Sequence, residues 1–298
     1  MYEGAFRILK ALGDGRSLDE NGVVRASGEA SSVVREVLRR YPQWFELEGR
    51  DLRCSERGLA ALCRELVARD VREPETVTWQ ESYEEIAAER RAPKRELDQV
   101  FVTTETAVRR AQLLLGAGEH QRGLVFLGDD DLTSAAVQLA GAGRKVTVVD
   151  ADDEILDVLR RQTDERGWEH HVVHHDLRNP IPRSMKGRFG AVFTDPPYAL
   201  DGFTLFVSRA IDLLKPDGRL YVCFGQSRRA SERGLQKQRV LGEAGLLVEA
   251  VFEDFNEYRG AESIGSRSAL WRCRMTPEAR PLVRGEVGGP LYTSRQPG

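Results

Sequence analysis

Apolar and polar positions recur with two different periods along this chain, and the change of period divides it into two regions. Up to about residue 70 the spacing is helical, over residues 5–12, 29–40 and 56–69. Within the second of these segments the apolar positions fall on one helix face. Residues 44–54 alternate, turn at a glycine and alternate again, which predicts a short hairpin between the last two helices.

Helices followed by a hairpin resemble a winged helix-turn-helix domain. We therefore assign residues 1–85 to a winged-helix-like α+β domain with its linker, and the charge-rich run 81–91 predicts a solvated linker helix. DNA binding is weighed here against a domain used for packing or dimerisation. The helix over 56–69 mixes acidic and basic side chains and makes no basic stripe, which argues against DNA binding.

From residue 98 onwards, short apolar runs alternate with helical segments. Strands are predicted at 124–127, 145–149, 170–174, 190–194, 219–224, 246–253 and 268–275. Such alternation builds a doubly wound, mostly parallel sheet, and a final pair of strands is typical of S-adenosylmethionine-dependent transferases. The predicted fold class is α/β, Rossmann-like, with a catalytic domain over 86–278 and a flexible Pro- and Gly-rich tail over 279–298.

Composition narrows the function classes. The 298 residues carry 44 basic and 47 acidic side chains, a net charge of −3 that gives no general attraction to nucleic acid. The four cysteines show no CxxC spacing, and no signal peptide or apolar run of transmembrane length appears, so we expect a cytoplasmic protein with no membrane partner. A homodimer is one oligomeric state that the sequence allows. The histidines of segment 170–175 have no second ligand cluster nearby, and we expect no metal.

The turn over residues 128–134 has an unusual composition for its position. It follows an apolar strand and leads into a helix, the layout of a nucleotide-binding unit, yet Gly128 is followed by Asp129, Asp130 and Asp131. Carboxylates at a helix N-terminus are stabilised in their charged form. They repel a phosphate and attract an ammonium, so we expect a cationic ligand here.

Further acidic side chains fall at predicted strand ends, where this architecture places its ligands. Asp150 comes 22 residues after Gly128, at the end of the second strand, the usual place for a carboxylate that binds both ribose hydroxyls. Asp176 ends the third strand, where it can accept a hydrogen bond from an adenine amino group.

The most specific motif is Asp195-Pro196-Pro197-Tyr198, at the end of the fourth strand. In transferases that modify amines, a loop of this form turns backbone carbonyls towards the acceptor nitrogen, because proline fixes φ and lacks an N–H. The carboxylate accepts a hydrogen bond from the same amine, and the aromatic ring flanks it. Since an ammonium is no nucleophile, a nearby carboxylate must first take its proton.

Together these motifs resemble the branched-chain polyamine synthases, also called N4-bis(aminopropyl)spermidine synthases. The likeness spans about residues 98–275 and rests on four segments: 128–134, 195–198, Phe255 to Tyr258, and Asp98-Gln99 with 103–106. It implies aminopropyl transfer from decarboxylated S-adenosylmethionine to the internal nitrogen of spermidine. The products are N4-aminopropylspermidine and then its quaternary bis form, with methylthioadenosine released.

The resemblance also implies roles for individual residues. The donor is expected to contact Gly128 and Asp129, with Asp150 on the ribose and Asp176 on the adenine. Asp130 and Asp195 are equal candidates for the proton-accepting carboxylate, and Asp131 either binds substrate or only caps the following helix. The acceptor polyamine is assigned to Pro196, Tyr198, Glu105, Glu257, Tyr258 and Glu262. The aspartates of the turn would repel the carboxylate of S-adenosylmethionine, which the decarboxylated donor lacks. Each unit-charge contact at ~4 Å is worth roughly 1 to 4 kcal/mol, so this repulsion favours the decarboxylated donor.

Two other functions are weighed against this one. The Asp-Pro-Pro-Tyr motif and the N-terminal domain suit a nucleic-acid or protein N-methyltransferase that uses S-adenosylmethionine, whereas the acidic turn and the net charge oppose it. A non-catalytic regulator that binds DNA through residues 1–70 and senses a nucleoside is the third possibility, but it has no need of the motif.

Overall fold

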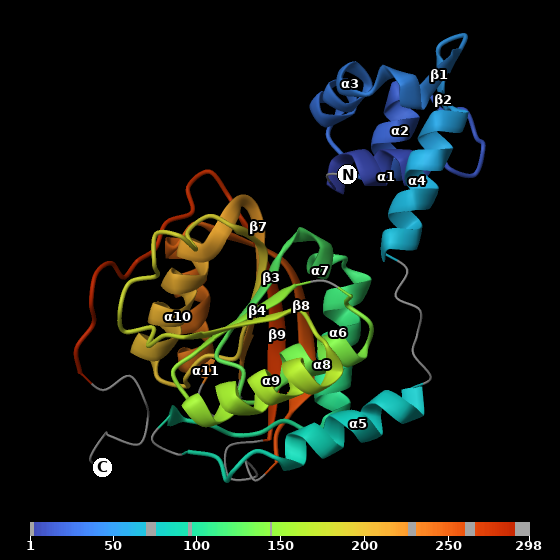
Figure 1. The fold of residues 1–298 in the computed structure, drawn as a ribbon. Coiled ribbons are helices and arrows are strands. Elements are labelled where there is room, and N and C mark those ends of the chain that lie inside the picture. The colour runs from blue at the N-terminus through green and yellow to red at the C-terminus, as the bar shows by residue number, and fades with distance from the viewer. Residues whose placement is uncertain are drawn as a thin grey trace. The chain divides into compact units, whose positions relative to one another are not determined.

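The computed structural model describes residues 3–69, 76–94, 97–143, 145–225, 231–259 and 266–289, and the chain divides into two compact units, 1–70 and 71–298 (Figure 1). The first unit contains α1 (Glu3–Leu12), α2 (Glu20–Ser27), α3 (Ser31–Arg40), the 3-10 turn η1 (Pro42–Trp44), β1 (Phe45–Glu48), β2 (Asp51–Cys54) and α4 (Glu56–Arg69).

The first unit has the predicted helices and hairpin, plus one helix that the sequence pattern missed. That helix, α2, begins where the Asp19 carboxylate accepts a hydrogen bond from the Gly22 N–H at 2.7 Å. It ends at Gly28, whose φ of 70° suits a residue without a side chain. Strands β1 and β2 pair antiparallel, and apolar side chains of α1 and α3 meet beneath them in a small core. The winged-helix interpretation of this unit stays a prediction.

The second unit is built on one seven-stranded sheet. Its elements are α5 (Thr76–Ala88), α6 (Thr104–Gly116), α7 (Glu119–Arg122), β3 (Leu124–Leu127), α8 (Thr133–Leu139), β4 (Val146–Asp150), α9 (Asp153–Arg166), β5 (His170–His174), β6 (Phe189–Thr194), α10 (Leu200–Leu213), β7 (Leu214–Phe224), α11 (Ser231–Glu243), β8 (Leu246–Glu257) and β9 (Arg267–Met275).

The strand order is β5-β4-β3-β6-β7-β9-β8. The first five strands in this order run parallel, and β9 lies antiparallel between β7 and β8. The Rossmann-like, doubly wound sheet predicted from the sequence is therefore confirmed. Because parallel strands share a direction, the carboxyl ends of β3, β4 and β6 meet at one edge of the sheet.

Helices cover both faces of this sheet (Figure 1). In β3, Leu124 and Phe126 face the core shared with α5, α6, α8 and α9, whereas Val125 and Leu127 face the core shared with α10 and α11. A strand buried on both faces has no polar side, which explains why β3 appears in the sequence as an unbroken apolar run. None of the helices in the described ranges is long and apolar enough to span a membrane.

Helix α5 belongs to the second unit, so the boundary between the units falls at residue 70 rather than at 85. Trp79, Tyr83 and Ile86 are buried in the core around α6 and α8. The Tyr83 hydroxyl also donates to the backbone carbonyl of Asp131. The charged positions of this helix had suggested a solvated linker, but its apolar positions at spacings of three and four residues form a buried stripe.

The first part of the C-terminal segment is held against α10, although its composition had predicted a flexible tail from residue 279. The backbone N–H groups of Leu282 and Val283 donate to Ser208 Oγ at 3.1 and 3.0 Å. The buried Arg209 donates to the Gly285 carbonyl at 2.6 Å. Residues 290–298, the rest of the predicted tail, lie outside the described residues.

The packing of α5 predicts a measurable loss of stability. Ile86→Ala removes a fully buried side chain and should lower the free energy of unfolding by about 2–5 kcal/mol, measured by denaturant titration. The control Glu84→Ala changes an exposed position of the same helix and should stay within about 0.5 kcal/mol. Equal small effects at both positions would contradict the docking of α5.

Candidate active site

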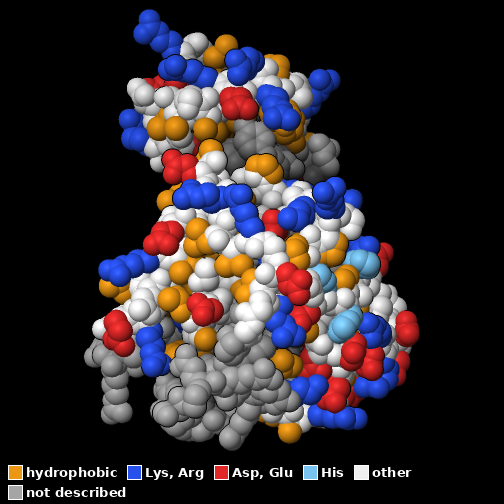
Figure 2. Space-filling view, turned by 90° about the vertical axis from the view of Figure 1, so that its left-hand side faces the viewer, with side chains coloured by type: hydrophobic (Ala, Val, Ile, Leu, Met, Phe, Trp, Pro, Cys, Tyr) orange, Lys and Arg blue, Asp and Glu red, His pale blue; other side chains and the backbone are white. Residues whose placement is uncertain are grey.

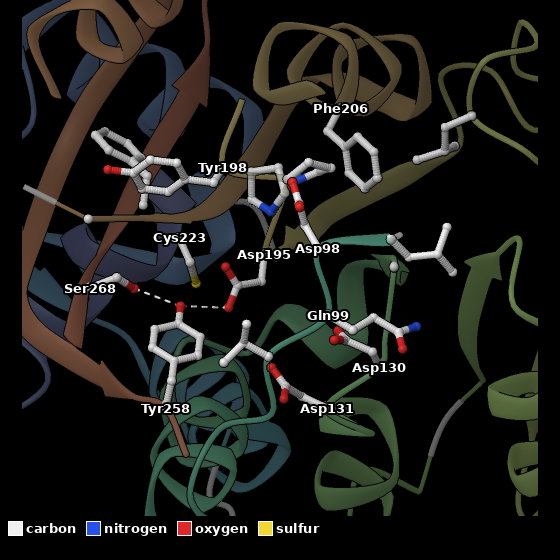
Figure 3. Close-up of a pocket in the computed structure, with 18 of the residues that line it drawn as sticks. Asp98, Gln99, Asp130, Asp131, Asp195, Tyr198, Phe206, Cys223, Tyr258 and Ser268 are labelled. Atoms are coloured by element: carbon white, nitrogen blue, oxygen red, sulfur yellow. Dashed lines mark hydrogen bonds between the residues drawn. The ribbon is translucent and has the colours of Figure 1, made fainter. Parts of the chain in front are cut away.

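The three motifs found in the sequence meet at the carboxyl edge of the sheet. Leu127, the last residue of β3, is in register with Val149 of β4 and Thr194 of β6. Gly128 then turns the chain with a φ of 69°, and its N–H donates to the Val149 carbonyl at 3.0 Å. The acidic turn, the end of β4 and the Asp-Pro-Pro-Tyr loop thus surround one cavity of about 570 Å³ (Figure 3).

Negative charge dominates the lining of this cavity. Among the described residues, eight acidic side chains contribute to it, namely Asp98, Asp130, Asp131, Asp150, Asp176, Asp195, Glu253 and Asp254. Three basic side chains of the same ranges do so, Arg178, Lys237 and Arg267. Such a surplus of carboxylates favours a cationic ligand and disfavours an anionic one.

Arg110, on α6, joins the acidic turn to the Asp-Pro-Pro-Tyr loop. Its fully buried guanidinium donates to Asp131 at 2.8 Å, to Asp195 at 2.5 Å and to the Asn256 side-chain oxygen at 2.8 Å. Burial alone would lower the pKa of Arg110, but the Cys223 thiol and the two carboxylates raise it well above its usual value. The guanidinium is therefore charged, and it offsets part of the repulsion between Asp131 and Asp195.

Asp195 is held through one of its two carboxylate oxygens. Both Arg110 and the Tyr258 hydroxyl donate to Oδ2, the latter at 2.8 Å, and Tyr258 also shares a hydrogen bond of 2.8 Å with Ser268 (Figure 3). Burial and the neighbouring Asp195 charge raise the pKa of Tyr258 well above its usual value, so the phenol keeps its proton and donates it. Within the described residues Oδ1 of Asp195 accepts no hydrogen bond, and it stays open to a ligand amine.

Asp130 lines the cavity with a carboxylate that accepts no hydrogen bond from any residue of the described ranges. Its backbone carbonyl is held by Arg90 at 2.6 Å. Burial raises the pKa of the Asp130 carboxyl well above its usual value, and the charges of Asp131 and Asp195 raise it further. A half-buried carboxylate with a raised pKa and no partner is suited to take a proton.

The other two aspartates of the turn differ in their relation to the cavity. Asp129, assigned to the donor, does not line the cavity; its carboxylate accepts the Ser134 N–H at 3.2 Å and caps α8. Burial raises the pKa of Asp129 to about 8. Asp131 lines the cavity but is bound by Arg110 and by the Val102 N–H at 2.8 Å, so it does not cap the helix. The expected binding of the donor by Asp129 stays a prediction, and its carboxylate lies outside the cavity lining.

Asp150 and Asp176 both line the cavity, on the side of β4 and β5. Asp150 accepts the backbone N–H groups of Asp129 and Asp152 at 2.8 Å each, which orients its carboxylate. Burial disfavours the charged form of Asp176, but hydrogen bonds from Arg178 outweigh this and lower its pKa. Leu177 and Phe206 line the same side, so it combines two oriented carboxylates with apolar walls, as a nucleoside requires.

Pro196, Tyr198 and Tyr258 line the cavity as assigned, whereas two of the predicted acceptor ligands do not. Glu105 lies exposed in the first turn of α6. Glu257 lies between Asn256 and Tyr258, whose side chains bind Arg110 and Asp195. Because the side chains of a strand alternate, Glu257 faces the other way. Its carboxylate lies 3.6 Å from the Arg267 guanidinium. Glu262 lies outside the described residues.

The cavity contains residues that sequence reasoning did not assign. Asp98 was noted only for its place in a motif, Glu253 was counted as the last residue of a strand, and Asp254 was given no role. Asp98, Asp254 and Ser266 line the cavity with positive φ values of 54°, 49° and 50°, a conformation that is uncommon outside glycine. Strained backbone of this kind is often found at functional sites, and it had no signal in the sequence pattern.

The strand part of the histidine-rich segment lies apart from this chemistry, whereas its last member, His175, lines the cavity next to Asp176. His171 and His174 of β5 are exposed, and Figure 2 shows histidines at the surface among interspersed acidic and basic side chains. His174 lies 3.9 Å from Asp153. In the described part of the chain, no group of three or more His, Cys, Asp or Glu side chains is arranged to hold a metal ion.

The Arg110 network predicts a large effect on stability. Arg110→Met leaves two carboxylates without their buried partner and should lower the free energy of unfolding by about 3–5 kcal/mol in denaturant titrations. Arg109→Met is the matched control, because the adjacent arginine of α6 is exposed, and it should cost about 0.5 kcal/mol or less. A methionine variant at 110 as stable as this control would contradict the role given to the ion pairs.

The part of the chain that forms this site is similar to proteins of known families. Residues 79–278 match the family model described as the branched-chain polyamine synthase A C-terminal domain. The N(4)-bis(aminopropyl)spermidine synthase of Thermococcus kodakarensis is 37% identical over 183 residues, which cover 60% of this chain and 52% of that protein. The synthase of the same name from Methanocaldococcus jannaschii is 33% identical over 240 residues, or 72% of this chain and 68% of that one.

A similar fold is found in the branched-chain polyamine synthase of Thermus thermophilus, whose crystal structure holds N4-aminopropylspermidine and 5'-methylthioadenosine. It matches with a TM-score of 0.66 and 26% identity, over 98% of this chain and 92% of that one. The chain spans about half the length of several curated relatives that it matches. By the family model and the Methanocaldococcus relative, the chain belongs to the branched-chain polyamine synthase family.

Proposed function

We propose that this protein transfers the aminopropyl group of decarboxylated S-adenosylmethionine to the internal N4 nitrogen of spermidine. The observation that carries the proposal is the cavity with eight acidic side chains, placed at the nucleoside-binding edge of the sheet. Relatives named for the same reaction, and a related structure that holds the aminopropylated amine with methylthioadenosine, support it.

The charge of the cavity supplies a reason for the choice of donor. S-adenosylmethionine ends in both an ammonium and a carboxylate, whereas its decarboxylated form ends only in the ammonium. Asp130 and Asp131 repel the carboxylate and attract the ammonium, at roughly 1 to 4 kcal/mol for each unit-charge contact of ~4 Å. Asp150 would accept from the ribose hydroxyls and Asp176 from the adenine amino group, beside the apolar wall of Phe206.

The reaction needs a neutral nitrogen next to a sulfonium. The N4 lone pair attacks the carbon of the aminopropyl chain that is bound to sulfur. The C–N bond to this carbon forms, and its C–S bond breaks. The electrons of the broken bond pass to sulfur, and neutral methylthioadenosine leaves. We assign the proton of the acceptor ammonium to Asp130, whose raised pKa suits a base, and the orientation of the nitrogen to Oδ1 of Asp195.

A second transfer converts the tertiary nitrogen into a quaternary one, which carries a permanent positive charge. The ring of Tyr258 lines the cavity beside Asp195 and is suited to stabilise that charge by cation–π contact. We place the reaction in the cytoplasm, because all four cysteines are free, as expected in a reducing compartment.

The proposal predicts a defined pair of products. Incubation with decarboxylated S-adenosylmethionine and spermidine should yield methylthioadenosine and a branched tetraamine, identified by chromatography and mass spectrometry. Calorimetry should show tighter binding of the decarboxylated donor than of S-adenosylmethionine. Folded protein that gives neither product would refute the proposal, and tighter binding of the carboxylated donor would favour an N-methyltransferase.

The two carboxylates nearest the reaction should respond differently to substitution. Asp130→Asn removes the base and should lower kcat by about 10²–10⁴-fold. In the unsubstituted protein kcat should rise with pH through the raised pKa of Asp130, because only the carboxylate form accepts a proton. The Asp130→Asn variant should lose this rise of kcat with pH.

Asp195→Asn should raise KM for spermidine as well as lowering kcat, since Asp195 holds the amine. The control Asp201→Asn, at an exposed position in the first turn of α10, should leave both parameters within about twofold. A normal rate and pH profile in Asp130→Asn would move the role of base to Asp195.

A further inference from the structure

A lysine lies in the cavity that otherwise suits a cation. Lys237 of α11 is only 4% exposed and lines the cavity. Its ammonium lies 4.5 Å from the centre of the Tyr198 ring, 5.3 Å from that of Phe203 and 5.8 Å from that of Phe224. Three aromatic rings around one ammonium form an aromatic cage, the arrangement that proteins use to bind alkylammonium ligands.

The cage, rather than an ion pair, accounts for the position of this ammonium. In the part of the chain that the structure describes, no carboxylate lies within ion-pairing distance of Lys237. Asp195 and Asp98 favour its charge from farther away, and Arg233, over the same Tyr198 ring, opposes it. Burial lowers the pKa of Lys237 to about 8, so the side chain is still mostly charged at neutral pH.

The sheet order places this cage on the acceptor side of the reaction. The donor nucleoside is assigned to the ends of β3, β4 and β5, while Asp195 follows β6. Phe224 ends β7, the next strand beyond β6, and α11 follows it in the chain. A polyamine bound with its reacting nitrogen at Asp195 therefore meets the cage on the side away from the donor.

We propose that Lys237 determines acceptor length: its ammonium occupies the aromatic cage that would otherwise bind a further ammonium of a longer linear polyamine. This inference rests on the proposed aminopropyl transfer and deepens it. A substrate arm directed at Tyr198 meets a like charge and a filled cage, both of which disfavour an additional ammonium there. The amines of the shorter acceptor would instead bind Asp98, Glu253 and Asp254, whose carboxylates also line the cavity.

Substitution of the lysine tests the proposal. Lys237→Met keeps the length of the side chain but removes its charge, and Lys237→Arg keeps the charge. With spermidine and a linear tetraamine as acceptors, Lys237→Met should raise the ratio of kcat/KM values, tetraamine over spermidine, about tenfold or more. The change should come through a lower KM for the tetraamine, and Lys237→Arg should keep the original ratio within about twofold.

Binding measurements separate this inference from the proposed reaction. Calorimetric titration of each amine, with methylthioadenosine present, should show the same rise in relative tetraamine affinity for Lys237→Met and for Lys237→Gln. The control Lys186→Met, which removes an exposed lysine paired with Asp212 outside the cavity, should leave the ratio unchanged.

If Lys237→Met changes kcat/KM and affinity equally for the two amines, the tetraamine-to-spermidine ratio stays the same. That result would overturn the role of Lys237 in acceptor length. An unsubstituted protein that transfers no aminopropyl group would refute the proposed reaction. The titrations would still report whether the lysine discriminates between the two amines.

Discussion

The active site depends on one buried guanidinium. Arg110 lies between Asp131 of the acidic turn and Asp195 of the Asp-Pro-Pro-Tyr loop, and it also binds Asn256 at the end of β8. Three strands that are distant in the sequence are thereby fixed around one cavity. Carboxylates gathered at this density repel one another and lose hydration, so a site for a polycation needs an internal cation to be stable before its ligand arrives. Arg110 supplies that charge from outside the cavity lining.

Much of the fold could be predicted because its signals are local. The apolar run of β3, the alternation of strands with helices and the final strand pair define the sheet. What escaped prediction was hidden by composition: α5 carries many charges, yet Trp79, Tyr83 and Ile86 form a buried stripe. Helix α2 was missed because Gly22 interrupts its helical pattern. The charged positions thus concealed the burial of this helix, which had been predicted as solvated.

The part of the candidate site that lies at the ends of strands could be predicted from the sequence. Asp130, Asp150, Asp176 and Asp195 all line the cavity, because parallel strands end at one edge. The direction of each aspartate side chain in the turn depends on backbone dihedrals, which the sequence pattern does not contain. The sequence therefore did not show that the Asp129 carboxylate accepts the Ser134 N–H at the start of α8. Arg110 and Lys237 lie on helices far away in sequence, where nothing distinguishes a buried basic residue from an exposed one.

The burial of these charges also affects how the protein responds to ionic strength. Mobile ions screen exposed charges over a Debye length of about 8 Å at physiological salt, but they screen partly buried pairs much less. A polyamine bound to the phosphates of a nucleic acid is in competition with every cation of the solution. Asp195, only 20% exposed and fixed by Arg110 and Tyr258, presents its open oxygen inside a cavity. Under the proposed function, a polyamine in this cavity would therefore stay bound at salt concentrations that weaken its binding to nucleic acid.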